Sequence, residues 1–126
     1  MIEYKNNPQN NIVEIIIEGK ITEEDFDQVV SQLKVDISKH GKLRILEEIR
    51  HFEGIDPLAL WKDIRFGFAH LNDFTHAALV ADAKWMRTLT EVFDRILSVK
   101  VKTFKPSQIE EARHWLADLS SDRPQP

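Results

Sequence analysis

Residues 52–93 read FEGIDPLALWKDIRFGFAHLNDFTHAALVADAKWMRTLTEVF, and this stretch decides the fold. It holds seven of the eleven aromatic residues of the 126-residue chain. Residues 57–71 and 83–97 show the 3.6-residue apolar spacing of helices, and the run 77–81 between them is typical of a short buried strand. Helix, strand and helix in succession predict crossover connections on a largely parallel sheet.

The two predicted helices differ in regularity. Asp56 is a good cap and Pro57 suits the first helical position of the first one. Its main apolar stripe is Leu58, Trp61, Ile64, Phe68 and Leu71, which Leu60 widens, while Phe66 lies off it. Gly67 costs this helix about 1 kcal/mol relative to alanine. The second helix, capped by Asp82, has an uninterrupted stripe of Trp85, Met86, Leu89, Val92, Phe93, Ile96 and Leu97.

The preceding half of the chain supplies two more strands and a helix. Residues 2–5 and 12–18 flank an asparagine- and proline-rich turn and predict a hairpin. Thr22 is a good N-cap for a helix that Gly41 ends, because glycine accepts the left-handed backbone. Residues 43–49 then form a strand, with Leu43, Ile45 and Ile49 on one side.

The remainder of the chain predicts an edge strand and a closing helix. Residues 99–104 alternate apolar residues or threonine with Lys100 and Lys102, and such lysines protect a sheet edge. Ser107 and Glu110 form a capping box for a helix that buries Ile109, Ala112, Leu116 and Leu119, with Trp115 beside them. The expected fold class is α/β, with a single mixed, largely parallel four- to five-stranded sheet and four helices. One domain spans residues 1–119, and 120–126 is a flexible tail.

Composition excludes several classes of protein. The net charge of −4, with lysines and arginines scattered among acids, argues against nucleic-acid binding. No apolar run reaches the ~18 residues of a membrane span. The first eleven residues lack a signal-peptide apolar stretch, so a cytoplasmic location is expected, peripheral at the inner membrane if the chain contacts lipid. With no cysteine there is no disulfide or thiolate metal site.

No catalytic motif is present in the sequence. The five histidines His40, His51, His70, His76 and His114 show no HExxH pattern and no pair at i, i+3 or i+4. The four glycines are isolated, so there is no phosphate loop, and no serine has the GxSxG context. Asp56, Asp63 and Asp82 are explained as helix caps or solvated charges. We therefore expect no enzyme activity, no cofactor and no metal.

The aromatic surplus of residues 52–93 is the best functional lead. These side chains are either plain core or the lining of an apolar cavity or membrane-contacting face, because contiguous exposed apolar surface marks a ligand, partner or membrane site. Gly67 is the expected hinge of the first helix. The candidate site residues are Trp61, Ile64, Phe68, Leu71, Trp85, Met86, Leu89 and Phe93.

Several segments, in their order and spacing, resemble the SpoIIAA-like family of bacterial proteins, whose fold is shared by STAS and CRAL-TRIO domains. They are GKITEEDF at 19–26, FEG at 52–54, ALWKD at 59–63 with Phe66, Phe68 and His70, FTHAALVAD at 74–82 with Trp85, and EARHWL at 111–116. The resemblance covers about residues 12–119. It implies a four- or five-stranded sheet with four helices.

The resemblance also implies a function. By analogy to CRAL-TRIO carriers, it implies binding of a non-polar, lipid-like molecule or reversible membrane association through the two aromatic helices. The alternative is a STAS-type protein-interaction module, including self-association as a homo-oligomer. STAS proteins that antagonise anti-sigma factors carry a phosphorylatable serine before the corresponding helix, whereas residues 50–58 here contain no serine or threonine. Such a phosphoswitch therefore has no acceptor in this segment.

Overall fold

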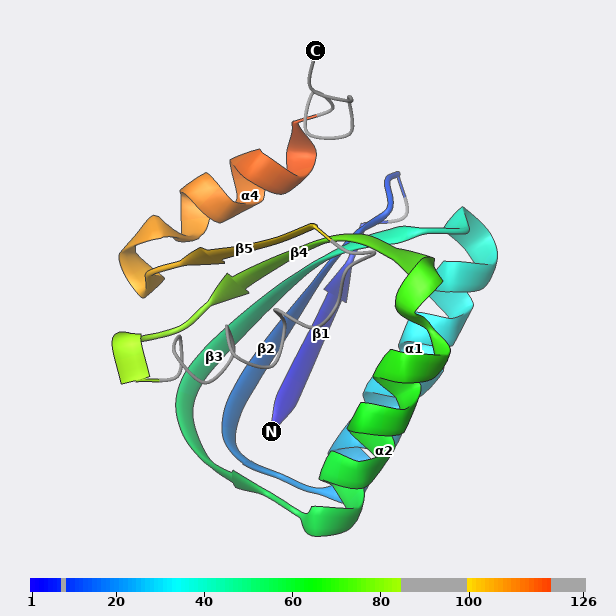
Figure 1. Ribbon diagram of the computed structural model, residues 1–126, viewed down its shortest axis with the longest axis vertical. Helices are drawn as coiled ribbons and strands as arrows, with labels where there is room; N and C mark the ends of the chain where they lie inside the picture. Colours follow the sequence, from blue (N-terminus) through cyan, green and yellow to red (C-terminus); the bar gives the residue numbers. More distant parts are fainter. Residues whose placement is uncertain (8, 85–99, 119–126) are drawn as a thin grey trace.

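The structure is a computed structural model that describes residues 1–7, 9–84 and 100–118 (Figure 1). The elements within these ranges carry the labels of Figure 1. They are β1 (Ile2–Asn6), β2 (Ile12–Ile21), α1 (Glu23–His40), β3 (Leu43–Ile55), α2 (Pro57–Ala69), the 3₁₀ turn η1 (Leu71–Asp73), β4 (Phe74–Val80), β5 (Lys100–Phe104), the 3₁₀ turn η2 (Pro106–Gln108) and α4 (Ile109–Ala117).

The strands form one five-stranded sheet in the order β1-β2-β3-β4-β5. β1 pairs antiparallel with β2 as the predicted hairpin, and the other three pairings are parallel. The predicted α/β fold with a single mixed, largely parallel sheet is confirmed. β5 is an edge strand, also as predicted from Lys100 and Lys102, and the Lys102 ammonium lies 5.4 Å from the Phe104 ring centre.

Helices cover both faces of this sheet. On one face Val13, Ile15, Leu43 and Ile45 pack against the α1 side chains Val29 and Leu33. On the opposite face Leu46, Ala78 and Val80 pack against Ala112 and Leu116 of α4. Figure 1 shows α1 and α2 side by side on one side of the sheet and α4 on the other. Strand alternation thus divides the core into two layers.

The caps of α1 follow the sequence prediction. Thr22 and Asp25 form a reciprocal capping box, with Thr22 Oγ1 accepting from the Asp25 N–H at 3.1 Å and Asp25 Oδ2 accepting from the Thr22 N–H at 3.0 Å. Gly41 ends the helix with φ of 79°, and its N–H donates to the Ile37 carbonyl. The helix is therefore fixed at both ends by local chemistry.

Two central strands are longer than the sequence pattern predicts. β2 continues to Ile21 and β3 to Ile55, so most of the segment expected as a connection after Ile49 is strand. The extension pairs Gly19 with Phe52 through a bulged register. Positive φ values of 69° at Gly19, 43° at His51 and 129° at Gly54 accommodate the bulge. The alternation of apolar and polar residues is lost in this extension, although the backbone pairing of β2 with β3 continues.

The C-terminal part also departs from prediction in detail. The capping box expected at Ser107 is replaced by η2, in which Gln108 Oε1 accepts from the Lys105 N–H at 2.9 Å. α4 begins at Ile109 and buries Ala112 and Leu116 as predicted. The predicted helix over residues 83–97, Leu119 and the tail at 120–126 lie outside the described residues, apart from the first residues of that helix.

Candidate docking surface on α2

One stripe of α2 fastens the helix to α1. Ala59 is completely buried, and the Lys62 ammonium one turn later donates to a Glu23 carboxylate oxygen and lies 3.3 Å from an oxygen of Asp27, both on α1. Phe66 packs edge-on against Phe26, with ring centres 6.5 Å apart. Residues 59, 62 and 66 share a helical face at i, i+3 and i+7 spacing, so this face is the packed one.

The structure shows which apolar side chains of α2 face α1 and which face solvent. Phe66, which lies off the predicted stripe, packs against the core layer formed by α1 and the sheet, whereas Trp61 is 58 % exposed. The face of α2 that meets α1 is therefore set by Ala59 and Phe66, and Trp61 lies outside it. Sequence spacing alone cannot separate two apolar faces when one helix carries apolar residues on both.

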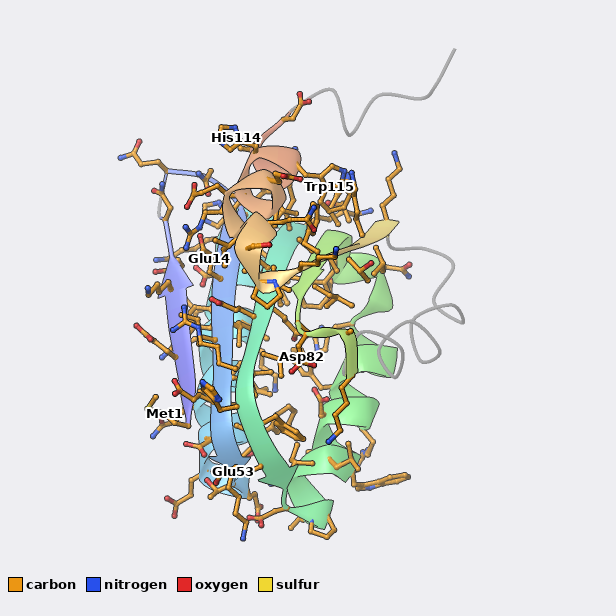
Figure 2. The ribbon with its side chains drawn as sticks, turned by 90° about the vertical axis from the view of Figure 1, so that its left-hand side faces the viewer. Met1, Glu14, Glu53, Asp82, His114 and Trp115 are labelled. Carbon is orange, nitrogen blue, oxygen red and sulfur yellow. The ribbon has the colours of Figure 1, made fainter. Side chains whose placement is uncertain are left out.

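An apolar surface lies at the beginning of α2. Leu58, Leu60 and Trp61 are 51 %, 45 % and 58 % exposed, and we refer to these three residues as the α2 patch. It adjoins the point where β3 passes into α2, and Figure 2 shows Glu53 of β3 at this end of the molecule, far from Trp115 of α4. Large apolar side chains exposed together on one turn mark a contact site more often than isolated ones do.

Two charged clusters lie near the beginning of α2. Asp56 occupies the N-cap position of α2 but makes no side-chain cap hydrogen bond, contrary to prediction, and its carboxylate lies 3.8 Å from the Lys20 ammonium. On the α1 side Lys62 forms ion pairs with Glu23 and Asp27. Its hydrogen bonds to these two carboxylates, first to Glu23, raise the Lys62 pKa. Arg65, which is exposed and follows Trp61 by one helical turn, adds a basic group on the side of the patch.

The predicted site residues are placed as follows. Trp61 is at the surface, Ile64 and Phe68 lie in α2, and Leu71 begins η1. Trp85, Met86, Leu89 and Phe93 lie outside the described residues, so their role in lining a site stays a prediction. The predicted hinge Gly67 sits inside a continuous α2, and a Cβ built there meets no atom within 4 Å.

Glu47 is an acidic residue that the sequence analysis did not single out. Glu47 lies on β3 between Ile45 and Ile49, on the same face as those two residues and opposite Ile15 and Leu79 of the neighbouring strands. Burial, followed by the nearby charge of Asp63 on α2, raises the pKa of Glu47 to about 7. The signal in the sequence is a carboxylate at the one polar position of an otherwise apolar alternation.

Comparison with known proteins identifies the family. The model of the SpoIIAA-like family matches residues 12–117. The chain belongs to the SpoIIAA-like family. A solved structure from Shewanella loihica PV-4, an uncharacterized protein of the DUF3478 family with a SpoIIAA-like fold, superposes with a TM-score of 0.76 at 21 % identity, over 93 % of each chain. This likeness establishes the shared fold. No curated protein matches the chain.

Other features of this SpoIIAA-like chain bear on its chemistry. Among the described residues no group of three or more histidine, aspartate or glutamate side chains is arranged to hold a metal ion. The buried His76 is placed by Thr75, whose Oγ1 lies 2.9 Å from its Nδ1, and by the Trp115 ring. No helix within the described ranges is both long and apolar enough to cross a membrane.

Proposed function

We propose that this SpoIIAA-like chain is a regulatory, non-catalytic binding module that docks a partner protein on the α2 patch. The observation that carries the proposal is the exposure of Leu58, Leu60 and Trp61 on a helix whose opposite face is anchored to α1. Tryptophan is enriched among the few residues that supply most of the binding energy of protein interfaces. Membership of a family that is typically regulatory supports the same conclusion.

A non-polar ligand or a membrane surface is the second candidate, because exposed tryptophan also favours a lipid interface. Two lysines near the patch are held in ion pairs, which favours a protein partner. Lys20 lies beside Asp56, and Lys62 is engaged by Glu23 and Asp27. Stable attachment of an amphipathic helix to anionic lipid draws on unpaired basic residues along its polar face. Charged groups at the edge of an apolar patch are typical of a protein interface.

A photo-crosslinking amino acid at position 60 tests this proposal in living cells of the source organism. The residue is at the surface, so the replacement leaves the core unchanged. We expect a discrete protein adduct of fixed mass that is absent when the same group replaces Val35, an equally exposed apolar residue of α1. Adducts with lipid alone would support the second candidate, and the absence of any position-specific adduct would refute both.

Trp61→Asp provides the complementary test. Because Trp61 is 58 % exposed, we expect the variant to keep a cooperative unfolding transition while it loses the adduct formed from position 60. Val35→Asp on α1 is the matched control and should preserve the adduct. If Trp61→Asp unfolds the protein, Trp61 contributes to the core and the docking role is wrong.

A further inference from the structure

β1 lies at one edge of the described sheet and pairs with β2 on its inner side. Figure 2 shows this strand, which begins beside the labelled Met1, along one side of the molecule, with α2 at the opposite side. A strand at the edge of a sheet presents a row of backbone N–H and C=O groups to its surroundings. The outer side of β1 is therefore a template on which a further strand can pair.

The hydrogen bonds at the start of β1 determine which of its backbone groups face outward. Met1 and Glu18 exchange two bonds: the Glu18 N–H donates to the Met1 carbonyl at 2.9 Å, and the Met1 amino group donates to the Glu18 carbonyl at 2.7 Å. Hydrogen-bonded and non-hydrogen-bonded pairs alternate along an antiparallel ladder. The N–H and C=O groups of Ile2, Tyr4 and Asn6 therefore point away from β2, toward the outer edge.

The side chains of β1 divide between the two faces of the sheet. Ile2 and Tyr4 pack on the α1 face, where the Tyr4 hydroxyl donates to Asp36. Glu3 and Lys5 lie on the opposite face, where their side chains are 51 % and 54 % exposed and their charged groups lie 3.7 Å apart. An acid thus precedes Tyr4 and a base follows it, so a two-fold rotation about Tyr4 exchanges an acidic position for a basic one.

We propose that β1 pairs antiparallel with β1 of a second copy of this chain across a two-fold axis at Tyr4, which joins two sheets into one. In this register Tyr4 forms a hydrogen-bonded pair with Tyr4 of the second copy, and Ile2 with its Asn6, giving about six backbone hydrogen bonds. Glu3 falls opposite Lys5 in the non-hydrogen-bonded pairs, where facing side chains are closest. The charges of the two strands then alternate in sign around the axis.

The charge pattern selects this partner and this register. A shift of two residues in either direction would place Glu3 opposite Glu3 or Lys5 opposite Lys5, and like charges directly opposite one another are destabilising. The other edge strand, β5, carries Lys100 and Lys102 but no acid, so two copies of it paired in full register would oppose Lys102 with itself. The α2 patch lies at the side of the molecule away from β1, so the pairing leaves it open and does not depend on the proposed function.

Sedimentation equilibrium of charge-reversal variants tests the pairing. The unmodified protein should approach twice the mass of one chain as its concentration rises. Glu3→Lys and Lys5→Glu each place like charges opposite one another, so each should raise the dissociation constant of the dimer at least about tenfold. An equimolar mixture of these two variants should associate again, because every facing pair regains opposite signs. Glu111→Lys, the same change at an exposed position of α4, is the matched control and should leave the dimer unchanged.

Disulfide formation reads the register directly, because the chain has no cysteine of its own. Under mild oxidation a mixture of Glu3→Cys and Lys5→Cys should form a covalent dimer, since non-hydrogen-bonded partners lie within disulfide reach. Either variant alone should not, because like positions lie on a diagonal about 7–8 Å apart. A protein that stays monomeric at millimolar concentration, or a dimer that tolerates both charge reversals and dissociates with Trp61→Asp, would overturn the pairing. The position-60 adduct tests the docking proposal separately, so either proposal can fail alone.

Discussion

The hydrogen bonds to Asp36 allow a quantitative prediction of how much they stabilise the edge strand β1. Asp36 on α1 is only 3 % exposed, and its carboxylate accepts hydrogen bonds from the Tyr4 hydroxyl and from Asn6 Nδ2, the latter at 3.0 and 3.1 Å. Both donors lie on β1, so the carboxylate joins the antiparallel edge strand to the covering helix. Burial and the acceptor Asp36 raise the Tyr4 pKa, so the phenol remains a donor at neutral pH.

The expected cost of breaking this network follows from the burial of each partner. A hydrogen bond to a charged group contributes about 1.5–3 kcal/mol, and Tyr4 is half-buried, so the loss of its bond falls near 1.5 kcal/mol. Asn6 is exposed and regains water, so it adds less. We expect Asp36→Ala to cost about 2–3 kcal/mol and Tyr4→Phe about 1.5 kcal/mol. The double variant should cost little more than Asp36→Ala alone, which gives a coupling energy of about 1.5 kcal/mol.

Urea unfolding followed by circular dichroism and by tryptophan emission measures these values. The matched control is Val35→Ala, the preceding residue of α1, which is 53 % exposed and should shift stability by less than about 0.5 kcal/mol. An unchanged slope with a lowered midpoint would show that the loss is in stability. A coupling energy below about 0.5 kcal/mol would refute the assignment of β1 anchoring to the Tyr4–Asp36 hydrogen bond.

Three further predictions concern α2 and the bulged strands. Gly67→Ala should raise the free energy of unfolding by about 0.5–1 kcal/mol, since the added methyl meets open space, and calorimetry measures the shift; a loss of stability would mean that α2 bends there. His51→Gly should stabilise the protein by about 1 kcal/mol in urea melts by relieving φ of 43°, and a clear loss would show that the ring makes a needed contact. The pKa of Glu47 is raised from 4.5 to about 7 in the folded chain, so ionisation of this carboxyl destabilises the fold increasingly as pH rises from 5 to 8. Glu47→Gln should therefore gain about 2–3 kcal/mol on the unmodified protein over this pH range, and parallel pH profiles would contradict this.

The sequence predicts much of the fold because local chemistry and packing agree over most of the chain. The β-branched run of β2, the Thr22 capping box and the Gly41 stop each act within a few residues, so their effects can be read locally. The edge position of β5 is equally predictable, since lysines at alternate positions suit a strand with one unpaired side. These features determine the element order and the largely parallel sheet.

The candidate site is harder to predict because it depends on contacts between distant residues. Leu58, Trp61 and Phe66 are all apolar on α2, and only the seating of Ala59 and Phe66 against α1 decides which of them is exposed. The extension of β3 through Gly54 depends similarly on the matching bulge at Gly19. Neither rotation of a helix nor pairing through a bulge leaves a periodic signature in one strand or helix taken alone.

The seating of α2 and the acid Glu47 on β3 are two places where the chain departs from the most stable choice. Ala59, Phe66 and the ion pairs of Lys62 with α1 hold α2 in place, whereas the raised pKa of Glu47 marks a carboxyl on β3 that is costly to ionise. An apolar residue at position 47 would remove that cost. Sequences depart from the most stable choice chiefly where function requires it.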